Sequence, residues 1–185
     1  MKLKKKKGSI EMFISSMIFI IITLVIVMQL RLKEVKVTQS LIEDGLVASN
    51  LAAATIDLKE YGTTNHIINN NFNKSFDDYV VALKHNLNLD NNFMPKNKNL
   101  INGKVDIIEF TLYNVVGNDI QMTKRESDGS ITKQTHTNKL GVMTTPNGTI
   151  IKSATIYSKI GFELRGYLKD TLYVYKDGSV DVVDK

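Results

Sequence analysis

Residues 12–30 read MFISSMIFIIITLVIVMQL, a run of nineteen residues without a charged side chain. Its polar members are Ser15, Ser16, Thr23 and Gln29. As an α-helix that rises about 1.5 Å per residue, this run would be roughly 28 Å long, which matches the hydrocarbon layer of a bilayer. We therefore predict a transmembrane helix over residues 9–30, with the lipid bilayer as a partner of the protein.

A basic leader, residues 1–8, precedes the apolar run and contains five lysines. The run is followed by Arg31, Lys33 and Lys36, with Glu34 among them. Because the more basic flank of a span tends to stay in the cytoplasm, we expect a single pass through the cytoplasmic membrane, with the N-terminus inside and the C-terminal domain outside. A cleaved secretory signal is the alternative, but bulky and charged residues stand where its small-residue cleavage site would lie.

Composition excludes several classes of function. The chain of 185 residues has a formal net charge of +5, and the five leader lysines account for all of it. The remainder is formally neutral, so nucleic-acid binding has little support. The chain contains no cysteine, which leaves neither a disulfide framework nor a cysteine-ligated metal site. About 150 residues remain beyond the leader and span, enough for one modest domain.

Residues 31–61 are predicted to continue the helix as a stem. No proline interrupts them, and small or apolar residues recur at steps of three and four. The ridge defined by this spacing consists of Leu41, Gly45, Ala48, Ala52 and Ile56. Gly62 is expected to end the helix as a C-terminal cap. The ridge could pack on the protein's own domain or, in part, against neighbouring copies.

Residues 62–103 are predicted to contain a loop, an amphipathic helix and a connection. Ser75 and Asp78 have the spacing of a capping box, which predicts that the helix begins there. It should end before Asn91. The apolar face of this helix would consist of Phe76, Tyr79, Val80, Leu83 and Leu87.

Residues 104–185 change to a period of two, which predicts an antiparallel β domain. Turn signals occur at residues 117–118, 127–129, 146–148 and 177–178, and the last is expected to close a final hairpin. Alternation over residues 154–168 predicts one buried face and one solvent-exposed face. Residues 123–138 could be strands exposed on both faces or a mobile hairpin. The predicted fold class is α+β: an N-terminal transmembrane helix continuing into a helical stem, then a short helix and a C-terminal antiparallel β-sheet domain.

No arrangement of residues typical of catalysis is present. His66, His85 and His136 lack the spacing of metal ligands, and phosphate-loop, dinucleotide-binding and serine-hydrolase motifs do not occur. We therefore expect no enzymatic activity, catalytic residue, metal, cofactor or small-molecule substrate. The tyrosines of the predicted sheet could form a binding face or simply pair across strands. They are Tyr157, Tyr167, Tyr173 and Tyr175.

The leader carries a resemblance to a known family. Basic residues ending at Gly8, followed by Ser9, Ile10 and Glu11 and by a long apolar helix, resemble the class III signal peptide of type IV pilins and pseudopilins. The most similar type is the TadE-like minor pseudopilin of bacterial tight-adherence pili, and the resemblance covers roughly residues 1–60. It implies cleavage by a prepilin peptidase between Gly8 and Ser9. It also implies other pilin-like subunits as partners, in a Tad or type IV pilus or a type II secretion-like apparatus.

Glu11 is the candidate assembly residue. A carboxylate at the mouth of an apolar run is unfavourable alone, and the new α-amino group of a neighbouring subunit would compensate it. Alternatively, Glu11 lies in the headgroup region beside the lysines at little cost. Two hypotheses follow for the function: a non-enzymatic, pseudopilin-like structural subunit, or an uncleaved membrane-tethered extracytoplasmic module for binding or sensing.

Overall fold

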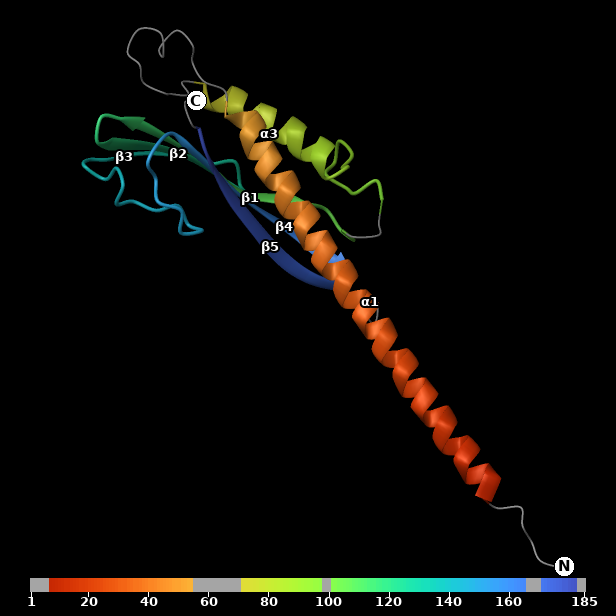
Figure 1. The fold of residues 1–185 in the computed structure, drawn as a ribbon. Helices are drawn as coiled ribbons and strands as arrows, with labels where there is room; N and C mark the ends of the chain where they lie inside the picture. Colours follow the sequence, from red (N-terminus) through yellow and green to blue (C-terminus); the bar gives the residue numbers. More distant parts are fainter. Residues whose placement is uncertain (1–6, 55–70, 98–100, 166–170, 183–185) are drawn as a thin grey trace, which may run out of the picture. The chain divides into compact units, whose positions relative to one another are not determined.

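A computed structural model describes residues 7–54, 71–97, 101–165 and 171–182. The chain divides into two units, residues 1–39 and residues 40–185. Helix α1 spans Lys7–Ala53, and its residues before Ser40 belong to the first unit. The second unit, called the head below, contains the remaining turns of α1, a second helix and five strands (Figure 1). The predicted α+β class, with an apolar N-terminal helix and a C-terminal sheet, is confirmed.

The head contains one antiparallel sheet with the strand order β3-β2-β1-β4-β5. Its elements are helix α3 (Phe72–Asn86) and strands β1 (Asp106–Val116), β2 (Asp119–Glu126), β3 (Ile131–His136), β4 (Thr155–Arg165) and β5 (Thr171–Asp181). The predicted turns at residues 117–118 and 127–129 join β1 to β2 and β2 to β3. Gly117 and Gly129 have φ values of 61° and 84°, a left-handed conformation that glycine adopts without a steric penalty.

The predicted final hairpin is wrong. Asp177 and Gly178 do not turn the chain but lie within β5, opposite Lys159 and Ser158 of β4. All eleven residues of β5 pair with β4. This continuous pairing gives the main-chain groups of Asp177 and Gly178 hydrogen-bond partners on β4, which a turn at these residues would remove. The Gly178 carbonyl also accepts a hydrogen bond from Asn50 Nδ2 at 3.0 Å. A long strand pairing therefore overrides a local turn signal.

The main core lies between the helices of the head and one face of the sheet. The predicted apolar face of α3 is confirmed, since Tyr79 and Leu83 are fully buried and Phe76, Val80 and Leu87 pack against the same cluster. The sheet contributes the remaining large side chains of this core, including Phe110, Leu112, Ile156, Ile160 and Phe162. Aromatic rings meet at its centre, where Tyr79 and Phe110 have ring centroids 5.0 Å apart.

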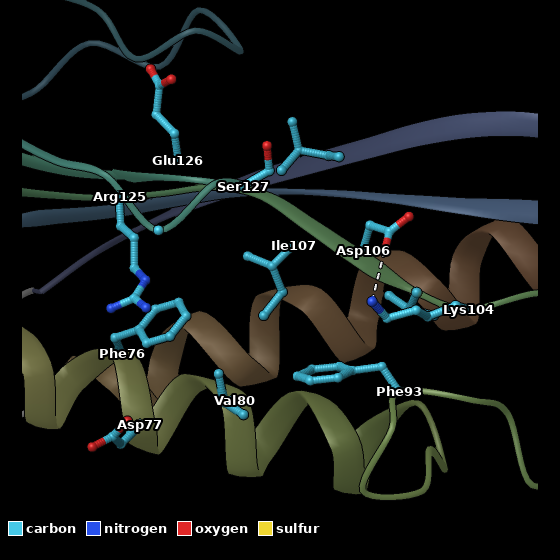
Figure 2. Close-up of a pocket in the computed structure, with 13 residues that line it drawn as sticks. Phe76, Asp77, Val80, Phe93, Lys104, Asp106, Ile107, Arg125, Glu126 and Ser127 are labelled. Atoms are coloured by element: carbon cyan, nitrogen blue, oxygen red, sulfur yellow. Dashed lines mark ion pairs between the residues drawn. The ribbon is translucent and has the colours of Figure 1, made fainter.

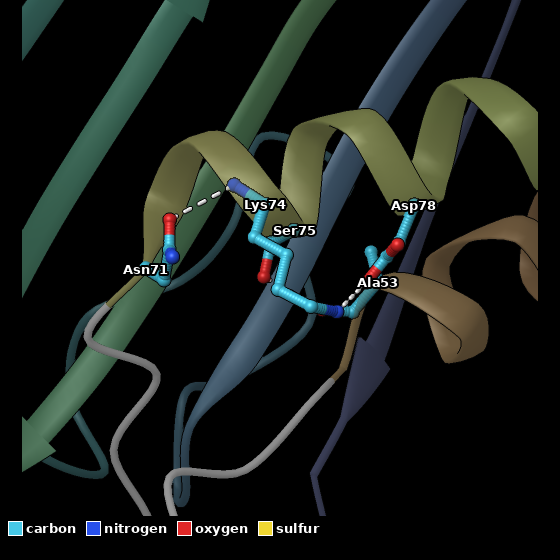
Figure 3. A network of polar contacts seen from close by, with 5 residues as sticks. All are labelled: Ala53, Asn71, Lys74, Ser75 and Asp78. Atoms are coloured by element: carbon cyan, nitrogen blue, oxygen red, sulfur yellow. Dashed lines mark hydrogen bonds and ion pairs between the residues drawn. The ribbon is translucent and has the colours of Figure 1, made fainter.

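The predicted start of α3 is wrong by several residues. Asn71 is the N-cap, and its Oδ1 accepts a hydrogen bond from the Lys74 main-chain nitrogen at 3.0 Å (Figure 3). Ser75 lies inside the helix and donates to the Ala53 carbonyl at 2.9 Å, which ties α3 to the end of α1. Asp78 forms an ion pair with Lys74 one turn earlier. An asparagine preceding the predicted start thus takes the capping role.

The buried face of α1 within the head differs from the predicted ridge. Leu41, Ala48 and Ala52 are exposed, and of the predicted residues in the described part only Gly45 is buried. The buried face consists of Ile42, Gly45, Leu46, Ser49, Asn50 and Ala53. Because Ser49 and Asn50 on this face are polar, apolar periodicity does not identify it. The helix ends at Ala53 rather than Tyr61, and the predicted Ile56 and Gly62 lie outside the described residues.

The second face of the sheet is not simply solvent-exposed, as the alternation predicted. Tyr157 lies on this face and is 1% exposed, because residues 139–152 fold over it. It packs with Tyr113, Ile120 and Ile151 in a second, smaller core. The predicted turn at residues 146–148 is present, with the Gly148 nitrogen donating to the Thr145 carbonyl. Residues 123–138 form the end of β2 and strand β3, but only β3 is exposed as expected, because residues 123–125 are half-buried.

Candidate functional site

The predicted processing residues lie at the start of α1, in the first unit. Gly8 and Ser9 belong to the first turn of the helix, and Glu11 follows with an exposed side chain. Within the described part of the chain, no side chain forms a hydrogen bond or ion pair with Glu11. Its carboxylate is therefore accessible to a group from outside this part of the chain.

The apolar segment that follows Glu11 is exposed along its whole length. Met12 is 78% exposed and Phe19 is 72% exposed, and no residue of the most apolar stretch is buried. Among the described residues, α1 is the one helix that is both long enough and apolar enough to cross a membrane. A contiguous apolar surface of this extent is unfavourable in water and is typical of a segment that contacts lipid.

The head contains a groove where β1 extends beyond β2. Strand β1 pairs with β4 from Asp106, but its pairing with β2 begins only at Glu109. Residues 106–108 therefore have a neighbouring strand on one side alone, as far as the described residues extend. A cavity of about 570 Å³ lies on the open side, between the end of β2 and α3 (Figure 2). Its apolar lining includes Phe76, Val80, Phe93 and Ile107.

One cation in this groove lacks a carboxylate partner. The Arg125 guanidinium lies 4.4 Å from the centre of the Phe76 ring, which holds it by a cation–π contact. No described carboxylate forms an ion pair with it. Lys104, by contrast, pairs with Asp106 at 3.4 Å, and Glu126 pairs with Lys124 at 3.0 Å. Figure 2 shows Glu126 pointing away from Arg125. The groove thus presents an apolar floor beside a guanidinium without an ion pair, and its α3 side also carries the Asp77 carboxylate, for which the described residues provide no ion pair either.

Sequence reasoning missed this groove. The sequence places Arg125 in residues 123–138, for which it leaves two structures open, and Phe76 on the apolar face of a helix. The two meet only because β2 pairs with β1 in one register and the chain then turns at residues 127–129. Local sequence carries no signal for that register.

The predicted tyrosine face is only partly formed. Tyr157 is buried in the second core, and Tyr167 lies outside the described residues. Tyr173 and Tyr175 are exposed neighbours on β5, with ring centroids 5.3 Å apart and planes at 77°. The Tyr173 hydroxyl reaches Asp106 Oδ2 across β4, at 3.1 Å. Burial and this hydrogen bond to a carboxylate raise the pKa of Tyr173.

The histidines lie apart, and none of them joins a metal-binding cluster in the described residues. His85 is exposed on α3. His136 ends β3, and its Nε2 is buried without a partner from the described part of the chain. His66 lies outside the described residues. No family model, curated protein or solved structure matches this chain.

Proposed function

We propose that this protein is a single-pass, membrane-anchored structural subunit of the pseudopilin type, in a Tad or type IV pilus or a type II secretion-like apparatus. One observation carries the proposal. Helix α1 exposes an apolar segment long enough to span a bilayer, and its last turns supply Ile42, Leu46 and Ala53 to the core of a small α+β head. An anchor built into the core of a small domain suits a subunit held at a membrane.

The leader supports a specific way of processing this subunit. A cut between Gly8 and Ser9 by a prepilin peptidase would remove all five leader lysines and free an α-amino group near Glu11. The Glu11 carboxylate is exposed, so the amine of a neighbouring subunit could reach it. In the weakly screening environment at the edge of a bilayer, such a pair would help to align subunits. The role proposed for the chain is structural and non-enzymatic.

The orientation follows from the charges that flank the span. The leader would stay in the cytoplasm and the head would lie outside it. A reporter that is active only outside the cytoplasm, fused after Lys185, should be active. Activity of a cytoplasm-only reporter at the same position would contradict this orientation.

Mass spectrometry of the protein purified from its own membrane tests the proposal. The expected N-terminus is Ser9, and Gly8→Val should block cleavage. Glu11→Ala should leave cleavage intact but reduce co-purification with other pilus-like subunits. Glu34→Ala, which removes an exposed carboxylate on the other side of the span, is the matched control. An uncut N-terminus in cells with an active prepilin peptidase would overturn the proposal.

The groove in the head favours a second candidate, an uncleaved tethered module that binds a ligand. An unpaired Arg125 beside an apolar cavity is the specific observation behind it. The two candidates differ in the N-terminus. The module would keep its leader and would show no dependence on Glu11.

A further inference from the structure

Strand β2 ends before β1 does, and this leaves main-chain groups of the sheet without a partner strand. Asp106 and Ile107 pair with β4 on one side, Ile108 lies where that pairing shifts register, and no strand of the described chain lies on the other side. Unpaired strand edges accept an additional strand because its N–H and C=O groups complete the ladder. Three residues extend about 10 Å, which is enough for a short pairing.

The groove beside this edge provides room for side chains. Its volume of about 570 Å³ lies between β1 and α3, so a segment that continued the line of β2 would face α3 on one side. Phe76, Val80 and Phe93 line the part that such side chains would meet. An apolar side chain placed there would leave water without displacing a polar group.

Arg125 favours a carboxylate at the position of the segment beside it, at the end of the groove away from Lys104 and Asp106. It lies on the face of β2 that is directed toward α3, opposite Phe110 of β1, and holds its guanidinium against Phe76. A planar guanidinium binds a carboxylate with two parallel hydrogen bonds. Because alternate residues of a strand share a face, a carboxylate beside Arg125 and an apolar side chain on the groove floor would be two residues apart.

We propose that the groove binds an extended peptide segment of a partner protein, which adds to β1 at residues 106–108 in line with β2. The segment carries a carboxylate that pairs with Arg125 and, two residues away, an apolar side chain that contacts Phe76 and Val80. The open strand edge selects a peptide over a free anion, since a small carboxylate would satisfy Arg125 but leave the edge unpaired. This inference does not depend on leader cleavage or on pilus assembly.

The test uses the full-length protein in detergent micelles and two fluorescent peptides. One is acetyl-Thr-Val-Thr-Glu-Thr-amide, and the other has the reversed sequence, acetyl-Thr-Glu-Thr-Val-Thr-amide. Fluorescence anisotropy should show saturable binding of at least one of the two peptides. Amide NMR signals of residues 106–108 should shift on binding. Replacing Glu with Gln in the peptide should weaken binding about tenfold, as expected when a charged hydrogen bond is lost.

Two changes to the peptide separate strand addition from simple ion pairing. Exchanging Glu with the preceding Thr puts the carboxylate on the opposite face and should weaken binding as much as Gln does. Proline in place of the central Thr removes a main-chain donor and should abolish binding. Sodium acetate should compete only weakly. Equal binding of the proline peptide would overturn strand addition.

Variants of the protein test the partner residue. Arg125→Gln should weaken binding of the Glu peptide about tenfold. It should not further weaken binding of the Gln peptide. Lys133→Gln on the exposed face of β3 removes the same charge and should change nothing. Circular dichroism checks that both variants are folded, and Arg125→Lys should restore part of the affinity. Unchanged affinity in Arg125→Gln, or no saturable binding of either peptide order, would overturn the proposal. A change in the oligomeric mass of the peptide-free protein with Arg125→Gln would identify a second copy as the occupant instead.

Discussion

Ser158 Oγ donates a hydrogen bond to Asn50 Oδ1 at 2.7 Å, and both side chains are fully buried. Asn50 Nδ2 donates in turn to the Gly178 carbonyl. One amide of α1 therefore joins two adjacent strands of the sheet. Buried polar groups are stable together but costly when one partner is removed, so this contact fixes how the last turns of α1 lie on β4 and β5.

Asn50→Ala should lower the free energy of unfolding of the head by about 2–4 kcal/mol. The substitution leaves the Ser158 hydroxyl and the Gly178 carbonyl buried without this partner, and it also creates a cavity. Urea unfolding of the full-length protein in micelles, followed by near-ultraviolet circular dichroism, measures the change. Asn73→Ala, at an exposed position of α3, is the control and should be close to neutral. Equal effects of the two substitutions would contradict a role for the buried amide.

Tyr79→Phe should change stability by less than about 1 kcal/mol, or should increase it. The Tyr79 hydroxyl is fully buried without a hydrogen bond of good geometry, and Ser158, the polar side chain nearest to it, donates its own hydrogen to Asn50, so removal of the hydroxyl relieves a desolvation cost while the ring contacts remain. The same unfolding experiment applies. Tyr157→Phe is the informative comparison, because the Tyr157 hydroxyl donates to Asp177 at 3.1 Å and its loss should be destabilising. A large loss for Tyr79→Phe would show that its hydroxyl has a partner.

Gly161→Ala should destabilise the head by about 1–3 kcal/mol. The phenol end of Tyr173 lies directly over Gly161, in the space that a β-carbon would occupy. Adding Tyr173→Ala should relieve most of this penalty, so that the double variant is more stable than the sum of the single changes predicts. Additive effects in the thermal unfolding of the four proteins would show that the ring moves aside freely.

Stability should fall as the pH rises above about 10. Burial raises the pKa of Tyr113 to about 12, with a contribution from the Glu109 charge, and burial also raises the pKa values of Tyr79 and Tyr157. Tyrosines in the unfolded chain ionise near 10, so the unfolded state loses protons first and gains stability relative to the folded state as the pH rises from 10 to 12. Below pH 10 these groups leave stability unchanged.

Ultraviolet absorbance of tyrosinate measures this pH dependence. Part of the tyrosine signal of the folded protein should appear later in an alkaline titration than it does for the chain in urea. Tyr113→Phe should reduce the late fraction. Coincident titration curves of the folded and unfolded chains would refute the prediction.

The sequence predicts elements whose pattern agrees with their packing. The apolar face of α3, with Tyr79 and Leu83 at its centre, follows helical spacing and is present as expected. The turns with Gly117 and Gly129 join strands as their residues indicate. In each of these cases, local chemistry and tertiary contacts favour the same structure.

The failures occur where a tertiary contact opposes the local pattern. Asn50 and Ser49 occupy the buried face of α1, so apolar periodicity places that face on the wrong residues. Gly178 has the chemistry of a turn but lies inside a strand, because pairing with β4 is continuous. Arg125 meets Phe76 through a strand register that no local pattern specifies.

The hydrogen bonds of Asn50 span 108 and 128 positions of the chain. During synthesis, α1 is made first and its partners on β4 and β5 are made nearly last. Contacts between such distant positions carry a high loop-closure cost and slow folding. Until the final strand is available, the buried face of α1, with Leu46 at its centre, has no sheet to cover it. The head is therefore expected to fold late and as one unit, and a chain shortened before β5 would leave that face open to aggregation.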